Sequence, residues 1–163
     1  MLGGTGAKDI HDMTNTRHMD PQVIQVARQK AQELYNARQV CCAKAVFLAV
    51  NDFLGYPAPD DELACLTSGF PTDRGAPEYK CRAVMAGVKA LALKYGRTAV
   101  ETENYNLFEA AGELRNRFRA RHRLMYCPAL NSQSKLDLSK HTDQCMNIVG
   151  EIAADVVELL EEV

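Results

Sequence analysis

The sequence predicts an all-α fold, a single compact helical domain of about five to six helices. Apolar residues recur at three- and four-residue intervals in several long segments, which is the pattern of helices that bury one face. No segment shows the alternation of a half-buried strand, and no internal repeat is present. With 163 residues, 47% of them hydrophobic and 25% charged, the chain suits one domain with its own core.

The first helix is expected over residues 22–38. Residues 1–19 lack any periodicity and are expected to form a mobile leader, ahead of a cysteine-containing domain that spans residues 20–163. Asp20 is a typical helix cap and Pro21 suits the first helical position. No glycine or proline marks where this helix ends.

The second helix is expected to open at Cys42 and to end near Phe53, because Gly55 and later prolines cannot continue it. Residues 60–66 then predict one short helical turn. Three longer helices should follow, over residues 77–96, 101–125 and 142–160.

Particular residues mark these last three helices. Pro77 is expected to open the first of them. The second carries apolar residues that include Phe108, and Pro128 places Cys127 at or just past its end. Thr142 is the expected cap of the last helix, which would put Cys145 in its first turn.

The six cysteines divide into four and two. Cys41 and Cys65 are expected to be small packing residues, since free cysteine is among the most buried residue types. No Cys-x-x-Cys pair occurs, so neither a thioredoxin-type motif nor a common zinc-finger spacing is present. The other four lie far apart in the chain, each near an expected helix end, and are the candidates for catalysis or metal binding: Cys42, Cys81, Cys127 and Cys145.

A thiol at a helix N-terminus is partly activated, because the helix dipole and free N–H groups favour the thiolate. The dipole contributes about 0.3–1 kcal/mol, less than one pKa unit, so a cation or metal must supply the rest. Arg82 beside Cys81 and His141 before Cys145 are the candidates for contacts to a cofactor. Three further cations lie near cysteines in the sequence: Lys80, His122 and Arg123.

Composition limits the partners. The net charge is −2 and the pI about 6.1, so no nucleic-acid partner is expected. No membrane span is expected either, since no stretch has the roughly 18 apolar residues that one requires. Without an apolar signal segment, a cytoplasmic location is expected, where thiols are mostly reduced. One basic run predicts a solvated helix face: Arg115, Arg117, Arg119, Arg121, His122 and Arg123.

Five short segments in this order resemble a known family: CAKAV at 42–46, TSGF at 67–70, CRAVMAG at 81–87, CPAL at 127–130 and CMNIV at 145–149. They are similar to the motifs of the redox-active protein family named C_GCAxxG_C_C after its cysteine pattern. The similarity runs from about Asp20 to Leu160.

The resemblance implies that Cys42, Cys81, Cys127 and Cys145 are the family cysteines and that they serve a redox role. A related module occurs in a multi-haem cytochrome of the split-Soret type together with an iron–sulfur centre; this chain has no Cys-x-x-Cys-His haem signature. The family also has glycines where this chain has Arg82 and Ala86. Gly87 is expected to take over part of their role in helix packing.

Several uses of the four thiols stay open from sequence alone. They could form dithiol/disulfide pairs or ligate an iron–sulfur cluster, in a protein that exchanges electrons with an unidentified redox partner protein. The alternative is a helical binding or regulatory module with a structural zinc or no cofactor, its cysteines simply packed. A homodimer formed through the Arg-rich helix or the last helix is a further alternative.

Overall fold

The computed structural model describes residues 20–37, 40–54, 59–68, 80–96, 104–123, 125, 127 and 138–162, and these contain helices but no strand. The all-α prediction is therefore confirmed. The leader expected at residues 1–19 and the helix start expected at Pro77 lie outside the described residues. The helices are α1 (Pro21–Asn36), α2 (Cys42–Asn51), α3 (Asp60–Ser68), α4 (Arg82–Tyr95), α5 (Tyr105–His122) and α7 (Leu138–Glu162).

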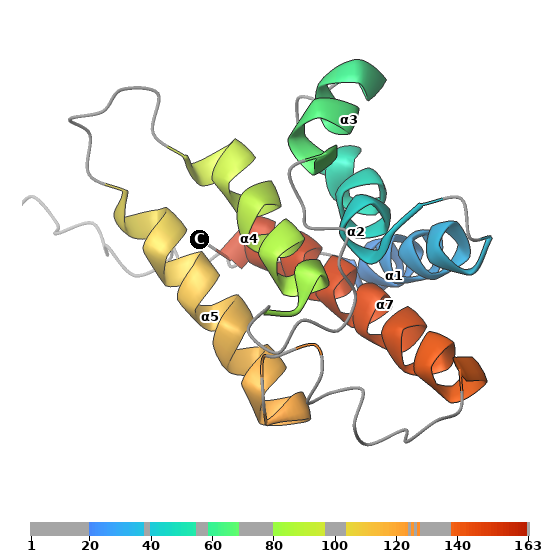
Figure 1. The fold of residues 1–163 in the computed structure, drawn as a ribbon. Helices are drawn as coiled ribbons and strands as arrows, with labels where there is room; N and C mark the ends of the chain where they lie inside the picture. The colour runs from blue at the N-terminus through green and yellow to red at the C-terminus, as the bar shows by residue number, and fades with distance from the viewer. Residues whose placement is uncertain are drawn as a thin grey trace, which may run out of the picture.

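Helix α7 is the centre of the fold. It contacts α1, α2, α4 and α5, and these helices lie around it in Figure 1. From Ile148 to Leu160 nearly every residue is buried, as expected for a helix that is covered on all sides. Helix α3 packs on α2 and projects from one end of the molecule.

Side-chain hydrogen bonds stabilise the N-terminal end of α1 and the C-terminal end of α7. The Asp20 carboxylate accepts a hydrogen bond from the Gln22 N–H at 2.9 Å, so the predicted Asp-Pro start of α1 is confirmed. At the other end of the chain, the Tyr95 hydroxyl donates to the carbonyl oxygens of Leu159 and Leu160. These bonds from α4 satisfy carbonyls at the C-terminal end of α7.

Gly87 allows α4, α5 and α7 to approach one another closely. A Cβ at this position would lie 2.8 Å from Leu114 Cδ2 on α5 and 3.0 Å from the Cγ2 atoms of Ile152 and Val156 on α7. The expectation that Gly87 serves helix packing is confirmed. Ala86, at the preceding position, is fully buried.

The starts of two helices differ from the prediction. Helix α4 starts at Arg82, and its N-cap Cys81 has a non-helical ψ of 121° and a backbone N–H that donates to the Met125 carbonyl at 2.6 Å. This pairing takes the place of helical hydrogen bonding before Arg82. Helix α7 starts at Leu138, one turn before the expected cap at Thr142.

Helix α5 is shorter than expected and places one aromatic residue differently. It ends at His122, where the next residue, Arg123, has a φ of 61° that cannot continue a helix. Phe108 was expected on the apolar face but is 71% exposed, because the buried face is centred on Leu114 and Phe118. None of the described helices is long and apolar enough to cross a membrane.

Candidate functional site: a four-cysteine centre

Two of the candidate cysteines lie at helix N-termini. Cys42 is the first residue of α2, as predicted, and its thiol is half-buried. Cys81 is buried and is the N-cap of α4 rather than a residue one turn inside the helix. Because α2 packs on α4, the two helix starts bring these thiols together.

The other two cysteines come from different local structures. Cys127 lies five residues beyond His122, the end of α5, and is half-buried. Cys145 is seven residues after Leu138, so it lies about two turns inside α7. The expectation that Cys145 sits in a first helical turn is wrong, and the α7 dipole therefore gives its thiol no N-terminal activation.

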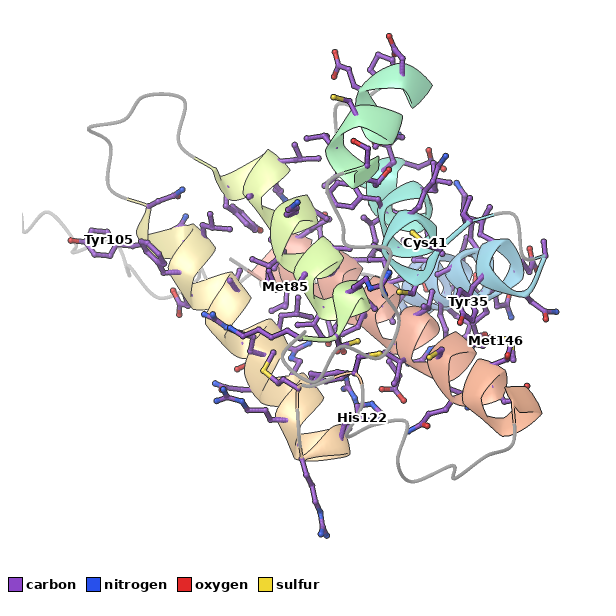
Figure 2. All side chains as sticks on the ribbon, viewed as in Figure 1. Tyr35, Cys41, Met85, Tyr105, His122 and Met146 are labelled. Carbon is purple, nitrogen blue, oxygen red and sulfur yellow. The ribbon has the colours of Figure 1, made fainter. Side chains whose placement is uncertain are left out.

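Electrostatic effects of the thiols on Cys42 and Cys81 indicate that the four cysteines lie in one region of the protein. The pKa of Cys42 is raised from 9.0 to about 12, mainly by burial and in smaller part by the charges that Cys81, Cys41 and Cys145 carry when ionised. The pKa of Cys81 is raised from 9.0 to about 11, again mainly by burial, with smaller contributions from the ionised forms of Cys127 and Cys145. Figure 2 shows several sulfur atoms, in yellow, between the start of α4 and α7.

The helix starts were expected to lower the pKa of these thiols. In the structure the pKa values of Cys42 and Cys81 are raised instead. The N–H groups of Val84 and Ala83 do lower the pKa of Cys81, although its sulfur makes no capping hydrogen bond of normal geometry. Loss of water around the sulfur is the larger effect. In the free protein the Cys42 and Cys81 thiols are therefore protonated at neutral pH.

Arg82 is the cation that acts on this centre. It is half-buried at the first position of α4, and its charge lowers the pKa of Cys42. Lys80 and Arg123 are exposed. The side chain of His141 lies outside the described part of the chain, so the expected contact of His141 with a cofactor stays a prediction.

Cys41 and Cys65 were expected to be buried packing residues, and this is wrong, because both are exposed. Cys41 immediately precedes α2 and its charge reaches Cys42, so it borders the centre. Cys65 lies on the projecting helix α3.

The basic run on α5 is not simply a solvated face. Arg117 donates to Glu113 and Glu158 at 2.9 and 3.0 Å. Arg121 donates to Glu151 at 3.1 Å and also to the buried Asp155.

His122 completes this interface. Its Nε2 lies 2.6 Å from Glu151 Oε2, and its ring contacts Phe118 at a centroid distance of 4.6 Å. Sequence reasoning missed these acids of α7. Their spacing of four and three residues, at 151, 155 and 158, matches the helical spacing of the basic residues and could have indicated the pairing.

The four thiols fit an iron–sulfur cluster or zinc by their donor chemistry, since both take cysteine thiolates. Among the described residues, no three histidine, cysteine or acidic side chains are gathered closely enough to hold a metal ion. Binding would therefore require the sulfurs to close around the bound group.

The fold and the site together define a class: a helical protein with four buried or half-buried cysteines, each from a separate segment. The model of the family described as "Putative redox-active protein (C_GCAxxG_C_C)" matches residues 40–159. The chain belongs to this family of redox-active proteins. No curated protein and no solved structure matches it.

Proposed function

We propose that this protein carries electrons at the four-cysteine centre, with Cys42, Cys81, Cys127 and Cys145 as ligands of an iron–sulfur cluster. The observation that carries the proposal is the electrostatic coupling of Cys42 to Cys81 and Cys145, and of Cys81 to Cys127 and Cys145. Crowded thiols resist ionisation as long as no cation lies among them, and a bound metal deprotonates them outright.

The residues around the centre suit this role. A cluster held by thiolates supplies reversible electron transfer. Burial of Cys81 limits the access of water to its sulfur. Arg82 and the N–H groups of Ala83 and Val84 stabilise negative charge on the thiolates. The six free thiols also suit a reducing compartment, and we propose the cytoplasm.

A dithiol/disulfide system is the second candidate, favoured by the proximity of Cys42 to Cys81. Joining their sulfurs would release two electrons and two protons to an oxidised partner disulfide, which would become a dithiol. Thiol exchange is fastest when the attacking thiol has a pKa near the ambient pH. With pKa values of about 12 and 11, Cys42 and Cys81 would exchange slowly, so we favour the cluster.

Anaerobic purification after expression with added iron tests the proposal. We expect a coloured protein with iron and acid-labile sulfide in equal amounts and an electron paramagnetic resonance signal after reduction. Serine at any of the four positions should lower the iron content or change the signal. Cys65→Ser, an exposed cysteine away from the centre, is the matched control.

Two other results would contradict cluster binding. An iron-free protein that acquires one defined disulfide between centre cysteines on mild oxidation would favour the dithiol system. A metal-free protein whose four thiols form no defined disulfide would exclude both versions.

A further inference from the structure

The outward face of α5 carries a stripe of residues that the cysteine centre does not use. At 3.6 residues per turn, these side chains fall within an arc of roughly 100°. We call this set the α5 outer face: Tyr105, Phe108, Gly112, Arg115, Asn116 and Arg119. Helix α5 forms one edge of the molecule (Figure 1), and Tyr105 lies at its outer end (Figure 2).

Two large aromatic side chains at one end of the α5 outer face are exposed to solvent. Tyr105 and Phe108 are each 71% exposed, more than any other large hydrophobic residue among those described. They lie one turn apart on the same side of the helix. Adjacent exposed aromatic residues are typical of protein-binding surfaces.

The other end of the α5 outer face is basic. Arg115 and Arg119 are exposed and make no ion pair with a described residue, whereas Arg117 and Arg121 on the inner side pair with acids of α7. The six residues of the α5 outer face include no acidic residue, and the exposed Glu109 borders them near the aromatic end. A positive surface without internal counter-charges is complementary to carboxylates on another molecule.

Gly112 lies between the aromatic and the basic ends. A Cβ at this position would meet no atom within 4 Å, so packing within the chain does not require glycine here. Glycine also lowers the stability of a helix relative to alanine. The absent side chain leaves room for the backbone of another protein to approach α5.

We propose that the α5 outer face docks an acidic electron-carrier protein, with carboxylates on Arg115 and Arg119 and an apolar contact on Tyr105 and Phe108. The arginine end of α5 leads within five residues to Cys127, and the Cys81 N–H bonds to Met125 in this connection. The basic end of the α5 outer face is therefore the end of α5 that leads to the cysteine centre. The identity of the partner as an electron carrier rests on the proposed function, whereas the docking surface does not.

Isothermal titration with a purified acidic flavodoxin as the probe tests the docking. We expect binding that weakens as salt is added. The double variant Arg115→Gln/Arg119→Gln should raise Kd by about tenfold or more. Gly112→Leu should raise Kd similarly without lowering the melting temperature, which separates loss of docking from loss of folding. Lys89→Gln, an exposed charge change on α4, should leave Kd unchanged.

Several results would overturn the proposal. One is failure of the wild type to bind flavodoxin, and another is binding that both variants retain. Tighter binding of a single-stranded oligonucleotide would assign the α5 outer face to nucleic acid. A dimer in sedimentation that Arg115→Gln/Arg119→Gln dissociates would assign it to a second copy. The thiol count and metal content of each variant report the state of the centre separately, so failure of docking and failure of the proposed function are distinguishable.

Discussion

Cys81 combines three roles in one residue. Its backbone N–H donates to the Met125 carbonyl, its position caps α4, and its thiol responds to the charges of Cys127 and Cys145. The first role fixes the segment that carries Cys127 beside α4. The position of the Cys81 sulfur is therefore set by backbone bonds that a serine variant would keep.

The raised pKa values of Cys42 and Cys81 predict that the protein loses stability in alkaline solution. Their pKa values are about 12 and 11 in the folded protein, against 9.0 for a free thiol. Between pH 9 and 11 the unfolded state therefore binds fewer protons than the folded state, and stability falls as pH rises. Below pH 9 this stabilisation is fully present.

Urea unfolding of the metal-free, reduced protein between about pH 8 and about pH 10.5 measures this effect. Each thiol should contribute a slope of about −1.4 kcal/mol per pH unit above pH 9. Cys81→Ala should flatten the slope, and the exposed Cys65→Ala should not. Equal slopes in wild type and Cys81→Ala would show that the Cys81 thiol ionises normally.

At the scale of helices, Gly87 and Gly112 can be compared because both lie within a helix. Gly87 is closely packed, whereas a Cβ at Gly112 would meet no atom within 4 Å. Alanine is favoured over glycine in a helix by about 1 kcal/mol. Gly112→Ala should therefore stabilise the protein by about that amount, since nothing lies near its Cβ. Gly87→Ala should destabilise it by about 1–3 kcal/mol, because the new methyl group would press on Leu114, Ile152 and Val156.

Chemical denaturation of both variants measures the two changes. The comparison holds intrinsic helix propensity constant, so the difference between the variants reports packing alone. Stabilisation by Gly87→Ala would mean that α4 can move away from α5 and α7 without loss.

Among the ion pairs that join α5 to α7 in the described residues, the Arg121–Asp155 pair has the most buried carboxylate. Asp155 is buried, and burial raises its pKa even though the hydrogen bond and charge of Arg121 lower it. Arg121→Met should cost about 2 kcal/mol, because it leaves a buried carboxylate without its cation. The double variant Arg121→Met/Asp155→Leu should recover most of that loss.

A double-mutant cycle from urea unfolding gives the coupling energy of this pair. Lys30 and Asp52, an ion pair at 2.5 Å whose side chains are 39% and 61% exposed, provide the control cycle. We expect a coupling below about 1 kcal/mol there. Equal couplings in the two cycles would contradict a special role for burial at Asp155.

On the scale of the whole molecule, the positions of the helices in the sequence were predicted better than the contacts that the helices make with one another. Apolar spacing and the Asp20-Pro21 cap depend on near neighbours, so α1 and the all-α fold were predictable. Four candidate cysteines were also singled out, with help from the family resemblance, and their role stays a prediction. The start of α7 was not predicted, since residues 129–137 contain no glycine or proline to mark it, and the depth of Cys145 followed from that error.

Three features of the structure depend on tertiary packing and could not be predicted from the sequence. The action of Arg82 on Cys42 depends on how α2 meets α4, and the two residues are 40 positions apart in the chain. The exposure of Phe108 depends on which side of α5 faces α7. The pKa values rose because the packed protein excludes water from the thiols, an effect that reasoning from helix dipoles leaves out.

Because one of the four cysteines lies on α7 and the other three come from three other segments, a group bound by all of them should stabilise the whole fold. A ligand that binds only the folded state adds RT ln(1 + [L]/Kd) to the unfolding free energy. We expect the anaerobically reconstituted protein to melt at a higher temperature than the metal-free protein in scanning calorimetry. Cys145→Ser should lose this gain and Cys65→Ser should keep it. An unchanged melting temperature on reconstitution would show that the thiols do not share one bound group.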